Sequence, residues 1–284
     1  MPELPELLHI LTKLREELLG RHVTAARVKE PVVLRCTVKG NLSLLLEHPL
    51  LDLFRKSHFL VFRFEGLDLA VNPMLAGRFR LAEPGEKDGA ALAFALEFEA
   101  AGASSSRAEL RFSDRKRMGK AYLISTDDWR AVPGMQTGGV DILSPEFTRE
   151  RFVSLLKRRR DQVRVFLMDK KAIDSLGNAY ADEVLFEAGI HPKTWCRSLS
   201  HDEAVGLHDA VVEVMSRAVE EVARRGEPID VKVRDFLKVR MKEACPRCGS
   251  RIRKAGVKGK DAYFCPRCQP PTRAGLVNWA RTGK

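Results

Sequence analysis

The chain opens with six residues that could supply an amine nucleophile, Met1-Pro2-Glu3-Leu4-Pro5-Glu6. A small second residue such as Pro2 usually permits removal of the initiator methionine, which would leave a secondary amine at the terminus. Because an α-amino group titrates at about 8 and a lysine at about 10.4, more of this amine is unprotonated at neutral pH. It could attack a sugar C1′ and form an iminium, while Glu3 handles the proton that the opening sugar needs. Prolines and acids are also ordinary at a helix start, so these six residues alone leave a purely structural role open.

Four cysteines near the C-terminus have the spacing of a metal site. They form two pairs, Cys245-Pro-Arg-Cys248 and Cys265-Pro-Arg-Cys268, with sixteen residues between them. Two tight turns at this separation can converge on one tetrahedral ion, and four thiolates leave no open coordination position. The spacing therefore predicts one structural Zn²⁺, with chance pairs or a redox dithiol as the alternatives. Cys36 and Cys196 stand alone, a pattern that in a reducing compartment favours metal over disulfides.

The segment between the outer cysteines is strongly basic. It has seven basic side chains and one acidic one, a local net charge of +6: Arg247, Arg251, Arg253, Lys254, Lys258, Lys260 and Arg267 against Asp261. A short hairpin with this charge could bind the phosphates of DNA, although RNA or another acidic partner would fit the charge equally well.

The whole chain is basic and of ordinary hydrophobicity. Its 284 residues carry 49 Lys+Arg against 38 Asp+Glu, a net charge of +11, and 44% are hydrophobic. This length indicates two compact domains, and the charge favours a polyanionic partner. There is no apolar run of about 18 residues and no signal-peptide layout at the start. We therefore expect a soluble, intracellular protein of the cytoplasm or nucleoid, with no membrane contact.

The elements that must position these residues change in character along the chain. Leucines spaced as on an amphipathic helix predict a first helix over Pro5–Leu19. Between about residues 21 and 125 the chain has short β-rich runs, which predict a β-sandwich or barrel. These runs are Val32–Val38, His58–Phe64, Ala91–Phe98, Arg107–Phe112 and Ala121–Ile124.

Helical periodicity dominates after a loop-rich stretch from Pro133 to Ser144. The expected helices are Phe152–Lys157, Gln162–Met168, Tyr180–Ala188 and His201–Arg224. We expect a β domain over residues 1–135, a linker over 136–148, a helical domain over 149–241, a zinc ribbon over 242–269 and a basic tail over 270–284.

Three motifs in this order resemble the formamidopyrimidine-DNA glycosylase and endonuclease VIII family. The first is the opening Pro2–Glu6, and the last is the cysteine ribbon. Between them, Leu167-Met168-Asp169-Lys170-Lys171, Gly177-Asn178-Ala179-Tyr180-Ala181-Asp182-Glu183 and Gly189-Ile190-His191-Pro192 look like the family's helix-two-turns-helix element. The resemblance implies an α+β fold: an N-terminal β-sandwich with a leading helix, a helix-two-turns-helix domain and a C-terminal zinc ribbon.

The resemblance also implies roles for single residues. Pro2 would be the Schiff-base nucleophile, Glu3 the acid at the sugar, and Glu6 a supporting acid or base. Lys56 resembles the family lysine that contacts phosphate and assists β-elimination. Without the resemblance, it would be interpreted as a solvated lysine at the start of a strand. Asn178 would meet a backbone phosphate beside the lesion, where a helix start offers free amides; alternatively, Gly-Asn is simply a good helix entry.

Members of the family insert side chains into the duplex where the extruded base had been. The matching positions are Leu75, in Met74-Leu75-Ala76-Gly77, and Lys116 with Met118, in Asp114–Gly119. The usual aromatic or arginine residues are absent at these positions. Without the resemblance, Leu75 and Met118 would be assigned to the core.

Two departures from the family pattern concern activity. Lys260 stands where the family usually has an arginine that grips phosphate and assists δ-elimination, and lysine keeps the charge but lacks the planar fork. Between Ala223 and Lys242 the chain looks shorter than in relatives that fold a loop over oxidised guanine. The preferred lesion therefore stays open among 8-oxoguanine, ring-opened purines and oxidised pyrimidines.

The sequence thus predicts a bifunctional DNA glycosylase and AP lyase of base excision repair. It would act as a monomer on damaged DNA, with one structural Zn²⁺ and no organic cofactor. The alternative is a non-catalytic protein of the same fold that binds damaged DNA or RNA. The presence of Pro2, Glu3, Lys56 and Asn178 favours the enzyme.

Overall fold

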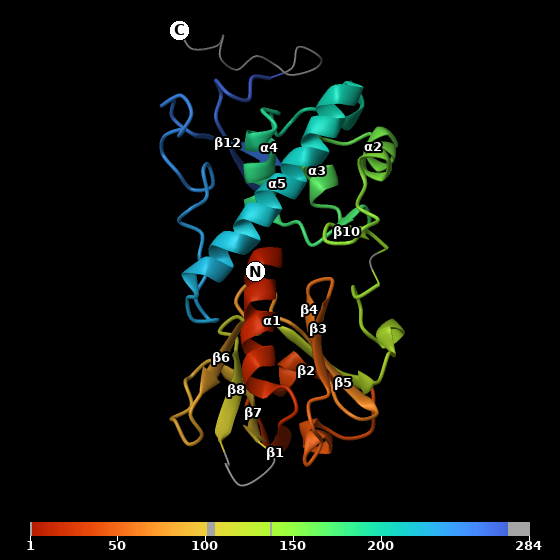
Figure 1. Cartoon of the computed structure of the whole chain (residues 1–284), viewed down its shortest axis with the longest axis vertical. Coiled ribbons are helices and arrows are strands. Elements are labelled where there is room, and N and C mark those ends of the chain that lie inside the picture. Colours follow the sequence, from red (N-terminus) through yellow and green to blue (C-terminus); the bar gives the residue numbers. More distant parts are fainter. Residues whose placement is uncertain (1, 101–105, 137, 272–284) are drawn as a thin grey trace. The chain divides into compact units, whose positions relative to one another are not determined.

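The computed structural model describes residues 2–100, 106–136 and 138–271, which fall into two compact units (Figure 1). The first unit contains residues 2–136 and 219–233, and the second contains residues 138–218 and 234–271. Helix α5 (His201–Arg225) contributes residues to both. The expected basic tail lies outside the described residues apart from its first two, Pro270 and Pro271.

The first helix, α1 (Leu4–Leu18), starts and ends one residue before the predicted helix. Pro5 fits its first turn because the missing N–H has no partner there in any helix. Glu3 is the N-cap residue, and its backbone N–H donates to Glu6 Oε2 at 2.7 Å. The buried leucines of α1 join the core of the β-sandwich, so the helix start is held by packing along its length.

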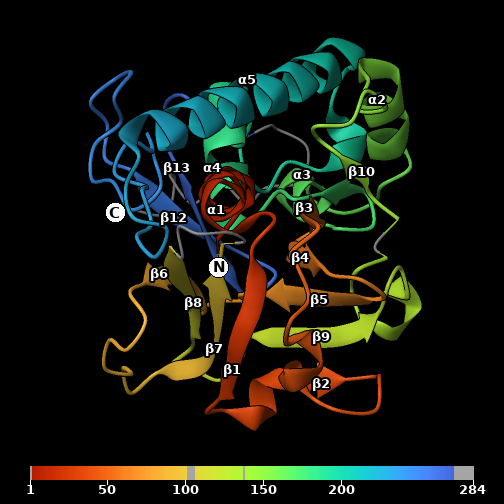
Figure 2. The same cartoon turned by 60° about the horizontal axis from the view of Figure 1, so that its bottom comes forward.

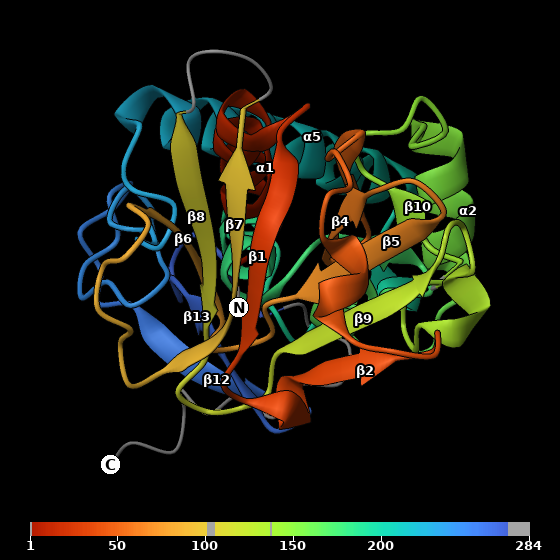
Figure 3. The ribbon, with the colours of Figure 1, turned by 90° about the horizontal axis from the view of Figure 1, so that it is seen from below.

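Two mainly antiparallel sheets form the sandwich (Figure 3). One has the order β1 (His22–Val28), β7 (Leu92–Glu99), β8 (Arg107–Ser113) and β6 (Arg78–Ala82). The other has the order β2 (Leu34–Cys36), β9 (Lys120–Ser125), β5 (Leu67–Asn72), β4 (Phe59–Arg63) and β3 (Asp52–Lys56). Aromatic side chains fill the space between the sheets: the Phe112 ring lies 5.1 Å from Phe79 and 5.3 Å from Phe94. The predicted sandwich with a leading helix is confirmed.

The strands differ in detail from the prediction. The run Val32–Val38 does not form one strand, because Pro31 begins a 3₁₀ turn over Pro31–Val33 and only Leu34–Cys36 pairs in the sheet. Strands β1, β3, β5 and β6 were not predicted at all. A register shift between Val23 and Ala25 interrupts the alternation of β1. In β5 the buried Asp68, paired with Arg63 at 3.0 Å, breaks the apolar pattern.

The second unit is mainly helical. Its short helices α2 (Arg149–Lys157), α3 (Val163–Leu167) and α4 (Asn178–Glu187) lie beside the long α5 (Figures 1 and 2). A parallel pair of two-residue strands, β10 (Val140–Asp141) and β11 (Ile173–Asp174), precedes α4. The hairpin of β12 (Arg253–Val257) and β13 (Lys260–Phe264) forms the ribbon. None of the helices in the described ranges is both long and apolar enough to cross a membrane.

Helix α4 is buried on nearly every side. From Ala179 to Phe186 each residue is buried, including the acids Asp182 and Glu183. The helix begins two residues before the predicted start, so Asn178 is its first residue and Gly177 its N-cap residue. It ends before Gly189, whose φ of +69° is a conformation that favours glycine. A buried helix with two acids requires partners for both carboxylates.

Candidate functional site

Pro2 and Glu6 lie in one small pocket of the first unit. The wall of the pocket comes from α1, from Arg78 at the start of β6, and from the last turns of α5 with the segment after it. Its remaining residues are His9, Ile10, Val222, Ile229, Asp230, Val231, Lys232 and Val233. Glu3 and Glu6 are each only 4% exposed, and the Glu6 carboxylate fixes the Glu3 backbone. The structure therefore brings the candidate nucleophile and one candidate acid together at a rigid helix start.

Lys56 is the last residue of β3, directly before the turn into β4. It is half-buried, and its Nζ lies 5.3 Å from the centre of the Trp129 ring. Trp129 in turn meets the Phe54 ring edge-on at 6.1 Å. Cation–π contact of this kind restricts a lysine that would otherwise be free in solvent. Lys56 is not among the residues that line the Pro2 pocket.

The three residues expected to insert into the duplex lie on two turns that both approach the Phe112 side chain. Leu75 is on the turn between β5 and β6, and Lys116 and Met118 are on the turn between β8 and β9. A Cβ added to Gly77 would stand 2.6 Å from the Phe112 ring, and one added to Gly119 2.8 Å from it, so both turns approach the same side chain closely.

The exposure of these three side chains differs. Leu75 is 52% exposed, Lys116 is exposed and Met118 is half-buried. The assignment of Leu75 to the core, which its residue type suggests, is therefore wrong. An exposed leucine on a well-supported turn is available to a partner.

Asn178 is held at the start of α4 by Arg164. The Arg164 Nη2 donates to Asn178 Oδ1 at 3.3 Å and to the carbonyl of Asp261 in β13 at 3.0 Å. Its Nε donates to Asp182 Oδ1 at 2.8 Å. Arg240 reaches the same two partners, with 2.7 Å to Asp182 Oδ2 and 3.2 Å to the Asp261 carbonyl. One buried network therefore ties Asn178 to the ribbon strand that begins at Lys260.

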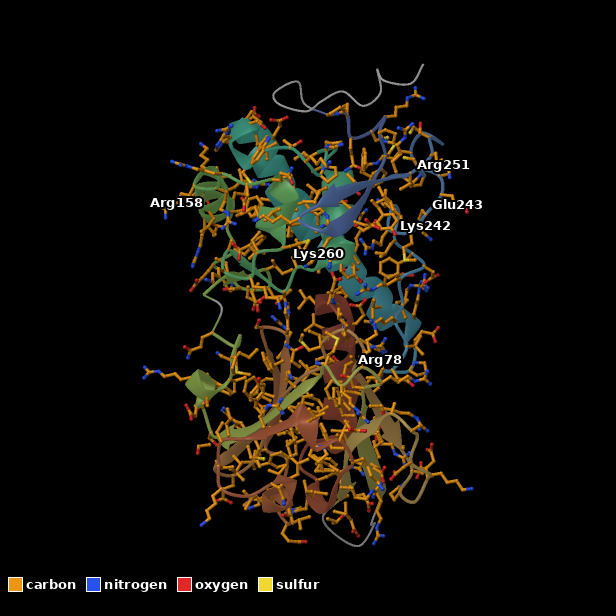
Figure 4. All side chains as sticks on the ribbon, turned by 180° about the vertical axis from the view of Figure 1, so that it is seen from behind. Arg78, Arg158, Lys242, Glu243, Arg251 and Lys260 are labelled. Carbon is orange, nitrogen blue, oxygen red and sulfur yellow. The ribbon has the colours of Figure 1, made fainter. Side chains whose placement is uncertain are left out.

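Lys260 follows a tight turn of the ribbon hairpin. Lys258 and Gly259 both have positive φ, +44° and +72°, as a two-residue hairpin turn of type I′ requires. Lys260 is exposed at this end of the hairpin (Figure 4). Together, the short turn and the network on the Asp261 carbonyl fix the backbone on both sides of Lys260.

The four predicted metal ligands converge. Their Sγ atoms all lie within 4.8 Å of one another, with 3.8 Å between Cys245 and Cys268 and 3.5 Å between Cys248 and Cys265. Four sulfurs at about 2.3 Å from a tetrahedral zinc would stand about 3.8 Å apart, so the cluster fits this ion. With four thiolates the ion has no position for substrate or water. The predicted structural Zn²⁺ is supported, and its role is to hold the ribbon.

Three residues to which the sequence reasoning gave no role hold the ribbon, or the chain just before it, to α4 and the residues after α4. The Glu183 carboxylate accepts the consecutive backbone N–H groups of residues 238–240. The buried Gln269 accepts from Cys265 N at 2.9 Å and donates to the Ile190 carbonyl at 2.8 Å. Arg164 completes the contact through Asp261. The available signal was the pair Asp182-Glu183 in an otherwise apolar helix, which requires buried partners.

The connection from α5 to the ribbon contains no regular element. Residues 226–252 are all described and include neither a helix nor a strand. Met241 in this connection has a φ of +59° and is 77% exposed.

Family models match three segments that together cover most of the chain. The formamidopyrimidine-DNA glycosylase N-terminal domain matches residues 1–121, and the formamidopyrimidine-DNA glycosylase H2TH domain matches residues 139–226. A zinc finger found in FPG and IleRS matches residues 242–271.

Similar proteins match 95% of the chain. A formamidopyrimidine-DNA glycosylase of Desulforamulus reducens is 31% identical over 295 residues, with 95% of this chain and 99% of the relative covered. One of Thermus thermophilus is 31% identical over 280 residues, with 95% and 98% covered. Among solved structures, Lactococcus lactis Fpg with abasic-site DNA has a TM-score of 0.83 at 25% identity and covers 95% of this chain and 100% of that one. MutM in complex with DNA containing carbocyclic 8-oxo-G has a TM-score of 0.82 at 26% identity, with the same coverage.

Proposed function

The chain belongs to the formamidopyrimidine-DNA glycosylase family, and from this membership we propose that it is a bifunctional DNA glycosylase and AP lyase that removes oxidised or ring-opened bases. The observation that carries the proposal is the rigid start of α1, where Pro2 and Glu6 share a pocket. This placement suits an N-terminal amine that must meet one sugar carbon in a fixed direction.

The proposed reaction begins once Met1 is removed and Pro2 carries the terminal amine. The amine attacks C1′ of the damaged nucleotide and gives up its proton. The C1′–N bond breaks, and the base leaves with the electron pair and takes up a proton. Glu3 protonates the ring oxygen as the sugar opens, which gives an iminium between Pro2 and C1′. Glu6 supports this proton transfer and holds the Glu3 backbone.

Strand cleavage follows from the iminium. Loss of a proton from C2′ lets the C3′–O bond break, and the 3′ phosphate leaves with the electron pair. Lys56 would contact phosphate and assist this β-elimination, with its ammonium held 5.3 Å from the centre of the Trp129 ring. Lys260 binds phosphate and assists expulsion of the second phosphate in δ-elimination.

The remaining candidates bind and deform the DNA. Asn178 would hold a phosphate beside the lesion at the start of α4, where the helix dipole favours an anion. Leu75, Lys116 and Met118 would fill the space of the extruded base. We further propose residues 149–241 as the DNA-binding domain, a monomeric enzyme, and action at the nucleoid.

Borohydride trapping tests the proposal directly. The full chain is incubated with a panel of duplexes carrying 8-oxoguanine, a ring-opened purine or an oxidised pyrimidine, and the iminium is reduced during turnover. We expect a covalent adduct that peptide mapping places on Pro2, and no adduct with a variant that retains Met1. An adduct on Lys56 or another lysine would overturn the assignment of the nucleophile. DNA binding without an adduct on any duplex would instead indicate a non-catalytic damage-binding protein.

A further inference from the structure

The segment after β9, residues 126–136, packs across the outer face of the sheet that contains β3, β4 and β5. Its Val132 is buried in one apolar cluster with Phe59 and Val61 of β4, whereas the alternate residues of β4 belong to the core between the two sheets. Trp129 packs against the same outer cluster. No step of the proposed reaction uses this segment.

Lys56 lies on this outer face of the sheet. It is paired with Phe59 in the β3–β4 ladder, and directly opposed residues have their side chains on one face of a sheet. Phe54, two residues earlier in β3, lies on the same face. Trp129 contacts both side chains of β3: its ring centre lies 5.3 Å from Lys56 Nζ and 6.1 Å from the centre of the Phe54 ring. The segment after β9 therefore places an aromatic ring against the candidate lysine.

A charged network fixes the backbone next to Trp129. The buried Asp68 of β5 accepts hydrogen bonds from Arg63 Nε and Nη2, each at 3.0 Å, and from Asp127 N at 3.0 Å. Arg63 Nη2 also donates to Asp127 Oδ1 at 2.5 Å. Two residues later, Trp129 N donates to the Asp127 carbonyl at 2.8 Å, and the Trp129 ring centre lies 5.9 Å from Arg63 Cζ. The position of the ring therefore depends on this network as well as on apolar packing.

The Trp129 ring leaves the charge of Lys56 available. Within the described ranges of the chain, the Lys56 ammonium forms no ion pair with an acid. An aspartate or glutamate at this place would neutralise the ammonium, whereas an aromatic ring attracts a cation without neutralising it. A lysine side chain loses rotamer entropy when one position is fixed, and contact with the ring offsets part of this loss. Lys56 is therefore a restrained cation without a counter-charge, which suits a group that must bind phosphate.

We propose that Trp129 is a positioning residue for β-elimination, whose ring holds the Lys56 ammonium in place for the phosphate that this step expels. The proposal rests on the proposed function, because it requires that Lys56 assist the elimination. The ring acts on the reaction only through Lys56. Arg63 and Asp68 act one contact farther away, since they hold the backbone from which Trp129 projects.

Single-turnover reaction of the full, zinc-loaded chain with an abasic-site duplex tests this role. Borohydride trapping measures the rate of iminium formation, and the β-product on a denaturing gel measures strand cleavage. Trp129→Leu keeps an apolar side chain but removes the aromatic face. We expect it to slow strand cleavage about fourfold, through loss of one partly exposed cation–π contact, and to leave the rate of iminium formation unchanged. Trp129→Tyr and Trp129→Phe keep a ring and should give intermediate rates, so the series tests the proposal even where the leucine variant loses stability.

A double-mutant cycle separates positioning of Lys56 from general packing. Lys56→Met removes the ammonium from an unbranched side chain and should slow strand cleavage about a hundredfold. In that background Trp129→Leu should change the rate by less than about twofold, because no cation remains to be held. The matched control is Trp195→Leu in the second unit, where the ring centre lies 5.9 Å from Arg197 Cζ. We expect this control to keep both wild-type rates.

Four results would overturn the proposal. Equal losses from Trp129→Leu with and without the ammonium would make Trp129 a packing residue only. Wild-type strand cleavage by Trp129→Leu beside an impaired Lys56→Met would reject the positioning and keep the proposed role of Lys56. Wild-type cleavage by Lys56→Met would reject both the positioning and that role, while trapping at Pro2 would still support the rest of the proposed enzyme. A chain that forms no adduct with any abasic-site duplex would reject both proposals.

Discussion

Substitution of Glu183 by glutamine should destabilise the attachment to α4 of residues 238–240, which lead into the ribbon. The side chain is 4% exposed. Its Oε2 accepts from Lys238 N at 2.6 Å, and its Oε1 accepts from Val239 N at 3.0 Å and Arg240 N at 2.9 Å. Glutamine has nearly the same shape, but it keeps one acceptor oxygen and presents an NH₂ group to the third donor.

The expected effect is the difference between two opposing terms. Loss of charge weakens each of the two retained bonds by about 1 kcal/mol, and the donor left without an acceptor costs about 1–3 kcal/mol. Burial raises the pKa of Glu183, which shows that the fold bears a desolvation cost for the carboxylate. Glutamine removes that cost. We therefore expect Glu183→Gln to lower the free energy of unfolding of the second unit by about 2–3 kcal/mol.

The urea concentration at which zinc is released measures this change in the stability of the second unit. With a urea dependence of about 2 kcal/mol/M, the midpoint should fall by about 1 M, and release to a chelator should become faster. Glu213→Gln is the control, because this acid is 56% exposed and pairs with Arg217 at 3.2 Å. Such a pair contributes roughly 0.5 kcal/mol. A Glu183→Gln midpoint equal to that of the control would refute the argument that the three N–H groups depend on the charge.

Three further outcomes are expected. Cys265→Ser should release zinc and weaken DNA binding while circular dichroism still shows the folded β-sandwich; undiminished affinity would show that the ribbon is outside the binding surface. Leu75→Ala should slow base release about tenfold if the side chain is inserted between bases. Because Leu75 is 52% exposed, its loss should leave the thermal midpoint unchanged, and equal rates for both proteins would remove it from the mechanism. Burial, with a smaller effect of the Lys193 charge, lowers the pKa of His191 to about 4 from an ordinary value of 6.5. Below pH 6.5 the unfolded chain protonates this histidine, whereas the folded chain keeps it neutral. The free energy of unfolding should therefore fall by about 3 kcal/mol as the pH falls from 6.5 to 4. In His191→Gln the urea midpoint should depend less on pH over this range. If the variant keeps the wild-type pH dependence, another group causes the effect.

The helices could be predicted from the sequence because their signals are local. The leucine spacing of α1 and the run of residues in α5 placed both helices within one residue of their observed ends. The cysteine pairs predicted the metal cluster for the same reason, since two short turns carry all four ligands. The strands of the sandwich were harder to predict from the sequence. Strand β6 has the exposed Arg80 and the half-buried Arg78 beside a single buried Phe79, and its pairing with β8 depends on residues 27 to 35 positions away.

The roles of buried polar residues could not be predicted, because their partners are distant in the sequence. Arg164 is 97 positions from Asp261, and Glu183 is 56 from Val239. No periodicity or spacing links such positions. The candidate site residues were identified by motif instead, and their exposure was open until the fold was known. Leu75 illustrates this point: its residue type suggests burial, and its turn exposes it.

The composition of the Pro2 pocket has a consequence for the order of events during synthesis. One wall of the pocket consists of residues near position 230, and Ile229 among them packs on the sandwich core. The N-terminus leaves the ribosome long before these residues are made. An aminopeptidase that removes Met1 during translation therefore acts on a terminus whose pocket is incomplete, before the later segment can cover it. Slow processing in a recombinant host would then leave a folded population that retains Met1, and a second digestion of purified protein would not fully convert it.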